Sequence, residues 1–222
     1  DRLRRLLRLC RLFRRGRGVY LYDTEGRRYL AFISGIGVNA LGHGHPAIRK
    51  AGAGQAGKLV HLSNLFYHPL QAALAARLTA ISGLDRAFFS NSGTEAWEGA
   101  LKLARIYARR HSRSRRQPRW RILALEGSFH GRTLGSLATT GQAKYRDPFA
   151  PLVPGVKFVR FNDVADLKTK FDRSVCAVGL ETIQGESGIR PLSREFLETA
   201  RALTRKHNAL LLLDEIQCGL GR

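Results

Sequence analysis

Two glycine-containing segments of the chain carry side chains suited to a phosphorylated ring. In the first, Gly93 and Thr94 would open a helix and present unpaired backbone N–H groups to a phosphate. In the second, at residues 126–133, Phe129 could stack on a ring and Arg132 could hold a carboxylate through paired hydrogen bonds. These side chains are suited to the phosphate, ring and carboxylate groups of a ligand.

Two further segments place acids directly after apolar runs. Glu181 and Glu186 follow the run at residues 175–180, and Asp214 follows four consecutive leucines. A charged carboxylate at the end of a buried strand is costly unless it is paired. A cationic ring nitrogen, a metal or an arginine would each serve Asp214, but the nearby histidines lack ligand spacing. The sequence therefore predicts no metal site.

Each segment alone has a plainer interpretation. Ser92 and Glu95 have the spacing of a capping box, which any helix start can use. Surface loops also commonly contain a phenylalanine or an arginine. The positions of the four segments are more informative, because ligands of open parallel sheets bind beyond the carboxyl ends of the strands.

The elements that would position these segments are strands alternating with helices, which indicates an α/β domain with a mostly parallel sheet. The apolar runs are nearly continuous, as is typical of strands covered by helices on both faces. Strands are predicted at residues 87–89, 120–125, 156–161, 175–180 and 209–213, and helices at 70–82, from about 92 to 110, and at 194–207. Residues 18–30 predict a hairpin. Residues 3–13 predict an exposed amphipathic helix, with an organelle transit peptide as the alternative.

The net charge of +21 on 222 residues raises a basic nucleic-acid-binding or membrane-surface protein as the non-enzyme alternative. The charge is concentrated in two arginine-rich stretches, at residues 1–17 and 105–121, and the rest of the chain is only mildly basic. Neither stretch has the interleaved aromatic side chains of a binding module. We therefore expect no specific nucleic-acid partner and no membrane partner.

Composition narrows the class of protein further. Hydrophobic residues make up 44% of the chain, which excludes wholesale disorder, and the longest aliphatic run, at residues 209–213, is too short to cross a membrane. The three cysteines, Cys10, Cys176 and Cys218, show neither a disulfide framework nor the spacing of a zinc site. A reducing, cytoplasmic location is expected.

Together, the motifs resemble those of the class III (subgroup II) pyridoxal-phosphate aminotransferases, most closely the acetylornithine aminotransferase group. The resemblance extends from about Gly16 to Arg222 and preserves the order and spacing of the motifs. The segments that carry it are DTEGR at 23–27, SGIGVNALGH at 34–43, NSGTEA at 91–96, SFHGRT at 128–133, IQGE at 183–186 and DEIQ at 214–217.

The resemblance implies how pyridoxal 5′-phosphate would be held. Gly93 and Thr94 resemble the pair that binds the phosphate, and Phe129 resembles the residue stacked on the pyridine ring. Asp214 resembles the catalytic partner that keeps the ring nitrogen protonated, so that the ring acts as an electron sink. On the other side of the ring, Ile216 would pack against the opposite face.

Three further roles follow from the same resemblance. Gln217 would bond the phenolic oxygen of the cofactor, and Arg132 would bind the substrate α-carboxylate. Glu186 is similar to the glutamate that pairs with a later arginine when the substrate is a basic amino acid and releases it for 2-oxoglutarate.

The family resemblance also implies an architecture and a reaction. The fold would be fold type I, with residues 1–45 contributing to a small domain and residues 46–222 forming the first part of the cofactor-binding large domain. The implied reaction moves an amino group from N-acetylornithine to 2-oxoglutarate in arginine biosynthesis. Ornithine, succinylornithine and 4-aminobutyrate are the alternative donors, and the full-length enzyme would be a homodimer.

The chain departs from the family pattern at Trp97, Thr182 and Ser187, and Trp97 could crowd the packing of the phosphate-binding helix. The family's Schiff-base lysine lies beyond the DEIQ motif, whereas all eight lysines of this chain precede Asp214. We therefore expect an N-terminal part of a longer enzyme, inactive by itself; the absence of any methionine agrees with this. We also expect it to be poorly soluble or partly molten alone, because the strand at 87–89 would lack a neighbour.

Overall fold

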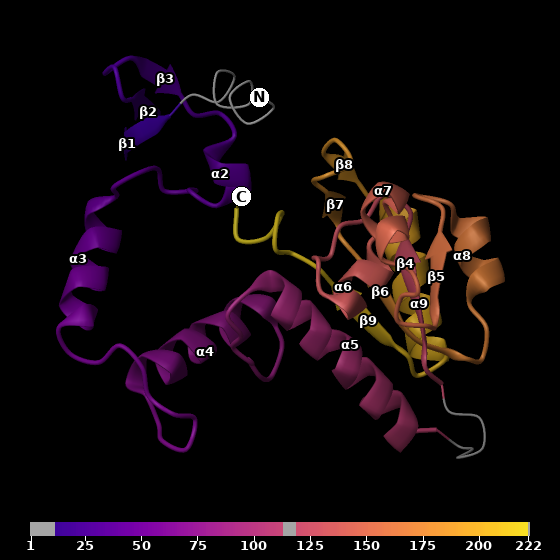
Figure 1. Cartoon of the computed structure of the whole chain (residues 1–222). Helices are drawn as coiled ribbons and strands as arrows, with labels where there is room; N and C mark the ends of the chain where they lie inside the picture. Colours follow the sequence, from indigo (N-terminus) through magenta and orange to yellow (C-terminus); the bar gives the residue numbers. More distant parts are fainter. Residues whose placement is uncertain (1–11, 113–118, 222) are drawn as a thin grey trace. The chain divides into compact units, whose positions relative to one another are not determined.

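The computed structural model describes residues 12–112 and 119–221, which form two compact units, one ending at Phe88 and the other beginning at Phe89 (Figure 1). Each unit is described by itself. All eight residues of the candidate site lie in the second unit. The division of the chain into domains at residue 45 stays a prediction.

The first unit contains a three-stranded antiparallel sheet of β1 (Phe13–Arg17), β2 (Tyr20–Asp23) and β3 (Arg28–Leu30), in that order. The predicted hairpin is confirmed as β2 and β3. Its turn is held by the carboxylate of Asp23, which accepts hydrogen bonds from the backbone of Glu25, the backbone and side chain of Arg27, and the hydroxyl of Tyr29. These bonds, chiefly that from the Arg27 side chain, lower the pKa of Asp23 to about 2.

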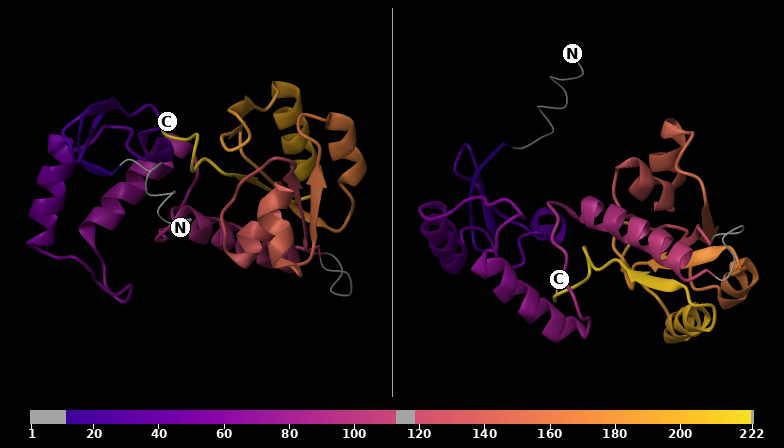
Figure 2. Two further views of the ribbon diagram at one scale, coloured as in Figure 1. Left: turned by 45° about the horizontal axis from the view of Figure 1, so that its top comes forward. Right: turned by 90° about the horizontal axis from the view of Figure 1, so that it is seen from below.

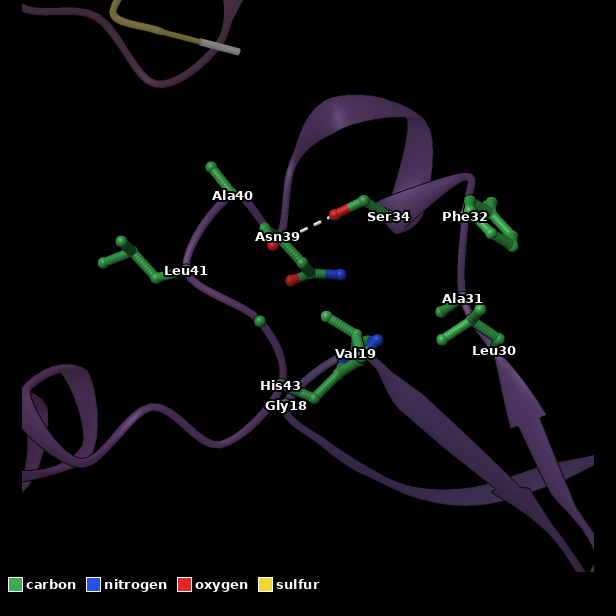
Figure 3. A pocket seen from close by; sticks show the side chains of 11 residues that line it. Gly18, Val19, Leu30, Ala31, Phe32, Ser34, Asn39, Ala40, Leu41 and His43 are labelled. Carbon is green, nitrogen blue, oxygen red and sulfur yellow. Dashed lines mark hydrogen bonds between the residues drawn. The ribbon is translucent and has the colours of Figure 1, made fainter.

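Three helices follow in the first unit: α2 (Ser34–Gly37), α3 (Pro46–Ala56) and α4 (Pro69–Ser82). The helix predicted at residues 70–82 is confirmed, with Pro69 in its first turn and Gly83 in the left-handed conformation that ends it. Helix α3 was not predicted, because Gly52 and Gly54 lower its helix propensity. A cavity of about 420 Å³ lies between the hairpin and the loop that follows α2 (Figure 3).

The second unit is built on a four-stranded parallel sheet in the order β5-β4-β6-β9. The strands are β4 (Arg121–Leu125), β5 (Val156–Val159), β6 (Val175–Leu180) and β9 (Leu210–Leu213). They match the apolar runs predicted as strands to within two residues. The α/β class with a parallel sheet is therefore confirmed.

Helices cover both faces of this sheet (Figure 2). Residues of α5 (Gly93–Arg110) share one hydrophobic cluster with Ile122 of β4. Residues of α8 (Val164–Lys170) and α9 (Arg194–Lys206) share a second cluster with Leu123 of the same strand. Because successive side chains of a strand point to opposite faces, the two clusters lie on opposite sides of the sheet.

The second unit also contains short elements that the sequence did not predict. They are α8, α6 (Leu134–Thr139), α7 (Ala143–Arg146), the 3₁₀ helix η1 (Asp147–Phe149), β7 (Ile183–Gln184) and β8 (Arg190–Pro191). Such segments are too short to show a helical or alternating hydrophobic period, so tertiary contacts determine their conformation.

Two predictions of secondary structure are wrong within the described residues. Residues 87–89 form no strand, because a strand exists through hydrogen bonds to a neighbour and this segment pairs with no described strand. Phe13, predicted to lie on an amphipathic helix, instead begins β1. The rest of that predicted helix lies mainly at residues 1–11, outside the described residues.

Two further findings concern the described residues alone. None of their helices combines the length and the apolar character needed to span a membrane. Of the second arginine-rich stretch, residues 113–118 lie outside the described part, and α5 ends just before them at Arg110.

Helix α9 offers a test of the local fold. Its N-cap, Ser193, accepts a hydrogen bond from the backbone N–H of Phe196. Ser193→Ala is expected to lower the free energy of unfolding by about 1 kcal/mol, measured by urea denaturation. Ser193→Asn, which keeps an acceptor at the cap, should retain most of that stability. Equal losses in the two variants would contradict a capping role.

Candidate functional site

The four polar segments predicted from the sequence meet at the carboxyl ends of β4, β6 and β9, where α5 begins. The loop after β4 contains Phe129 and Arg132, the loop after β6 contains Glu186, and the loop after β9 contains Asp214. Direct contacts connect these loops to one another and to the first turn of α5, as described below. The structure therefore brings the eight predicted residues into one region.

Helix α5 begins with a glycine because its first turn is crowded. The side chain of Ser92 caps the helix by accepting from the backbone N–H of Glu95. Neither Gly93 nor Thr94 forms a backbone N–H hydrogen bond within the described residues, so both donors point out of the helix start. A Cβ atom on Gly93 would lie 3.1–3.2 Å from three side-chain carbons of Ile216.

The loop after β4 closes against the same helix start. Gly131 has a φ of 122°, and a Cβ atom there would overlap the hydroxyl of Thr94. That hydroxyl lies 3.0 Å from the Thr133 hydroxyl and donates to Ser136 at 2.9 Å. The side chain of Thr94 is thus engaged with α6, which leaves its backbone N–H as the group available to a ligand.

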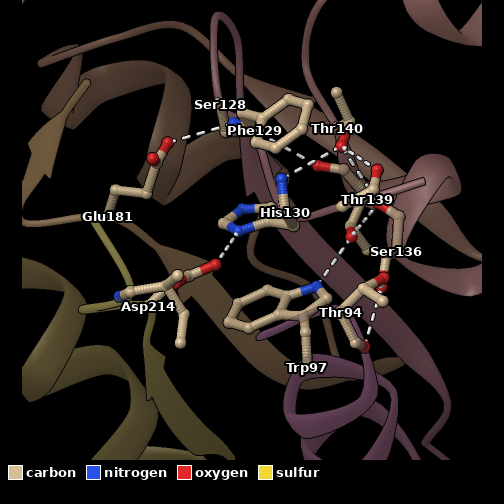
Figure 4. Close-up of polar contacts among 12 residues, drawn as sticks. Thr94, Trp97, Ser128, Phe129, His130, Ser136, Thr139, Thr140, Glu181 and Asp214 are labelled. Atoms are coloured by element: carbon tan, nitrogen blue, oxygen red, sulfur yellow. Dashed lines mark hydrogen bonds and ion pairs between the residues drawn. The ribbon is translucent and has the colours of Figure 1, made fainter. Parts of the chain in front are cut away.

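Asp214 is buried, with 8% of its surface exposed, and its partner is a histidine that the sequence did not single out. Its Oδ2 accepts a hydrogen bond from Nδ1 of His130 at 2.7 Å (Figure 4). Its Oδ1 accepts from the backbone N–H of Ile216 at 3.1 Å. The sequence signal was present, because His130 adjoins Phe129 in the same loop. A histidine partner is therefore an addition to the ring nitrogen, metal or arginine that the sequence predicts for Asp214.

The imidazole of His130 is in turn covered by Trp97 of α5. The two rings stack with their centroids 4.0 Å apart and their planes 9° from parallel. The expectation that Trp97 would crowd the helix packing is not met, because Trp97 fills space above Gly179 of β6, where a Cβ atom would lie only 2.9 Å from the indole.

Glu181 is a second buried carboxyl group at the strand ends, 3% exposed. It accepts a hydrogen bond from the backbone N–H of Phe129 at 3.1 Å, which fixes the loop that carries the ring. Burial raises the pKa of Glu181 to about 8, and the carboxylates of Asp214 and Glu186 add to the rise. An acid that directly follows a buried strand gives the same sequence signal that identified Asp214.

This raised pKa predicts a pH dependence of stability. The ordinary pKa of the carboxyl is 4.5, so between about pH 4.5 and about pH 8 the unfolded chain binds fewer protons than the folded chain. The contribution of Glu181 to stability is therefore largest at low pH and falls as the pH rises through this window. Glutamine does not titrate, so the free energy of unfolding of Glu181→Gln should not show this fall. Relative to wild type it should increase by up to about 1.4 kcal/mol for each unit by which the pH is raised within this window.

Urea denaturation at several pH values from 5 to 8 measures this effect. The exposed Glu126→Gln, at the end of β4, provides the matched control and should follow the wild-type curve. Parallel stability curves for wild type and Glu181→Gln would show that Glu181 is ionised in the folded protein.

Arg132 is exposed and lies over two aromatic rings. Its guanidinium carbon is 4.3 Å from the ring centroid of Tyr145 and 5.6 Å from that of Phe129. Within the described residues the guanidinium forms no ion pair, so its edge is available to a planar carboxylate. Arg132 therefore stands next to the ring predicted to stack on the ligand.

Glu186 and Gln217 form the last contact of the site. Gln217 donates from Nε2 to Oε1 of Glu186 at 3.4 Å, and its side chain lies over Gly185, where a Cβ atom would overlap it. Within the described residues Glu186 forms no ion pair. The carboxylate of Glu186 is therefore available to pair with a cationic group.

These features fit a phosphorylated pyridine ring. The start of α5 presents two N–H donors beside a glycine that keeps the backbone approachable, which suits a phosphate. Phe129 supplies an aromatic face and Ile216 an aliphatic one. The carboxylate of Asp214 is buried and retains lone pairs for a cationic ring nitrogen. Among the described residues, no group of three His, Cys, Asp or Glu side chains is arranged to hold a metal ion.

Comparison with known proteins identifies relatives along nearly the whole chain. The class-III aminotransferase family matches residues 5–222. The acetylornithine aminotransferase of Clostridium acetobutylicum is 46% identical over 210 residues, covering 95% of this chain and 54% of that protein. The acetylornithine aminotransferase of Neisseria meningitidis serogroup A is 49% identical over 207 residues, covering 93% of this chain and 51% of that protein. The chain spans about half the length of the curated relatives it matches.

Solved structures have the same fold. N-acetylornithine aminotransferase from Stenotrophomonas maltophilia matches with a TM-score of 0.81 at 37% identity, covering all of this chain and 55% of that one. Ornithine aminotransferase from Toxoplasma gondii matches with a TM-score of 0.87 at 30% identity, covering 95% of this chain and 50% of that one. Another structure of the Toxoplasma enzyme is described with partial occupancy of pyridoxal phosphate at its active site. The fold-type I class implied by the resemblance is confirmed.

Proposed function

This chain belongs to the class-III aminotransferase family, and from that membership we propose that it is the cofactor-holding part of a pyridoxal-phosphate-dependent transaminase. The observation that carries the proposal is the convergence of a phosphate-type helix start with a buried carboxylate. Ile216 connects the two, because its side chain lies against Gly93 and its backbone N–H bonds the carboxylate of Asp214.

Each residue of the site has a task in this proposal. When bound, pyridoxal phosphate supplies an electron sink for the bonds at the α-carbon of an amino acid. Gly93 and Thr94 bind the phosphate through their backbone N–H groups, and Asp214 holds a proton on the ring nitrogen. Phe129 and Ile216 cover the two ring faces and exclude water from them.

The other polar residues act on the substrate and on the ring oxygen. Arg132 binds the substrate carboxylate through its free guanidinium edge, and Gln217 bonds the phenolic oxygen. Glu186 faces the side chain of a basic donor, pairing with an arginine elsewhere in the protein when 2-oxoglutarate is bound.

We assign N-acetylornithine as the amino donor and 2-oxoglutarate as the acceptor, in arginine biosynthesis, in a cytoplasmic homodimer. The support is the identity of 44–49% to curated acetylornithine aminotransferases. The match to ornithine aminotransferase structures favours ornithine as the second candidate donor. Succinylornithine and 4-aminobutyrate remain alternatives from the same family.

The test uses the protein expressed from the complete reading frame that contains this chain. It is supplied with pyridoxal phosphate, 2-oxoglutarate and each of the four donors in turn, and glutamate formation is measured. The highest kcat/KM is expected with N-acetylornithine. A higher value with another donor would replace the substrate assignment, and no glutamate from any donor with a folded protein would contradict the transaminase.

A further inference from the structure

Trp97 is held rigidly at the centre of the second unit. Its Nε1–H donates to the hydroxyl of Thr139 at 2.8 Å, and the far edge of its six-membered ring lies over Gly179 of β6. The indole is 5% exposed. Rotating it would break a buried hydrogen bond and drive the ring against a strand, so Trp97 presents a fixed flat face to whatever packs on it.

The side chain packed on that face is the fully buried imidazole of His130, whose ring forms one hydrogen bond within the described residues. Its Nδ1 bonds Oδ2 of Asp214, while its Nε2 is buried and forms no hydrogen bond within the described residues. One hydrogen bond fixes the position of a nitrogen but leaves the plane of the ring free. The parallel contact with the indole supplies the missing constraint (Figure 4).

The protonated nitrogen follows from the same geometry. A carboxylate only accepts hydrogen bonds, so the bond at 2.7 Å requires a proton on Nδ1 of His130. If the ring turned over about its Cβ–Cγ bond, Cδ2 would take the place of Nδ1, and the hydrogen bond to Asp214 would be lost. The indole opposes this turn because the imidazole would have to leave the stack to make it.

We propose that Trp97 is a positioning residue that holds His130 in the plane and in the Nδ1-protonated form that bonds Asp214, and thereby fixes the direction of the Asp214 carboxylate. The alignment of the triad Trp97–His130–Asp214 does not depend on a cofactor. The further statement, that the Asp214 carboxylate is oriented toward the ring nitrogen of a cofactor before the cofactor binds, rests on the proposed function.

The experiment observes the His130 side chain directly. The complete reading-frame product is labelled with ¹⁵N-histidine, prepared without pyridoxal phosphate, and studied by NMR, with His130→Gln identifying the signals. Wild type should show a proton on Nδ1 of His130 that exchanges slowly with water. In Trp97→Leu this exchange should accelerate by about 2-fold to 10-fold, the change that an aromatic stack of ordinary strength supports.

Two other variants separate positioning from space filling. Trp97→Phe keeps an aromatic ring to pack on His130 but loses the bond to Thr139 and one ring of the indole, so it should exchange more slowly than Trp97→Leu. Gly179→Ala keeps Trp97 but adds a methyl group 2.9 Å from the indole, so it should accelerate exchange even if Trp97→Leu fails to fold.

Backbone amide exchange in β4 and β6 controls for general loosening of the core. An unchanged His130 Nδ1 proton in folded Trp97→Leu or Gly179→Ala would overturn the proposal. Because no ligand is present, a negative result here leaves the transaminase assignment untouched. Failure of the protein to transaminate would likewise leave these NMR results standing.

Discussion

Asp214→Asn is expected to weaken the binding of pyridoxine 5′-phosphate by about 100-fold, because losing one partner of a buried charge pair costs about 2–5 kcal/mol. Pyridoxine 5′-phosphate keeps the ring nitrogen and phosphate of the cofactor but has no aldehyde, so its binding requires no lysine. Asparagine preserves the shape of the side chain and an oxygen for His130 while removing the charge. Calorimetric titration measures the affinity.

The ultraviolet absorption of the bound ring gives an independent readout of the same variant. Wild type should bind the ring with its nitrogen protonated, whereas Asp214→Asn should bind the neutral ring. Glu215→Gln, which removes a charge from the neighbouring exposed residue, provides the matched control and should behave as wild type. Equal affinities for wild type and Asp214→Asn would show that Asp214 does not face the ring nitrogen.

Gly93→Ala is expected to weaken the binding of pyridoxine 5′-phosphate by about 10-fold or more, since hydrogen bonds to a charged group contribute about 1.5–3 kcal/mol each. The added methyl would lie 3.1–3.2 Å from Ile216, so the helix start or Ile216 must shift. Either movement disturbs the two N–H groups proposed to bind the phosphate. Calorimetric titration again measures the loss.

Gly99→Ala offers a control in the same helix. A Cβ atom at Gly99 would meet nothing within 4 Å, and its position in the middle of α5 favours alanine. This variant should bind pyridoxine 5′-phosphate as wild type does and should be more stable by about 0.5–1 kcal/mol. Similar losses of affinity in the two variants would mean that the helix as a whole, rather than its first residue, determines binding.

Much of the second unit could be predicted from the sequence because its signals are local. Four continuous apolar runs became the four parallel strands, and Ser92 caps α5 as its spacing to Glu95 indicated. The strand predicted at residues 87–89 failed because its apolar sequence alone does not provide a hydrogen-bonded neighbour. The short helix α6 was missed because its contacts with other elements, among them α5, β4 and β5, define it.

The candidate site shows the same division between local and distant signals. The residues proposed to touch a ligand lie in recognisable loop motifs, and their assigned roles stay predictions. The pairing of His130 with Asp214 was not predicted, because the two residues are 84 residues apart in the sequence and meet only in the folded chain. The fit of Trp97 could not be predicted for the same reason. The indole packs over Gly179, which belongs to β6 and not to the helix that carries Trp97.

The most direct test of the proposed site is a crystal structure of the complete reading-frame product with pyridoxine 5′-phosphate. We expect the phosphate on the backbone N–H groups of Gly93 and Thr94, the ring between Phe129 and Ile216, and the ring nitrogen on the carboxylate of Asp214. A phosphate bound elsewhere, or a ring nitrogen turned away from Asp214, would contradict the assignment of this end of the sheet as the cofactor site.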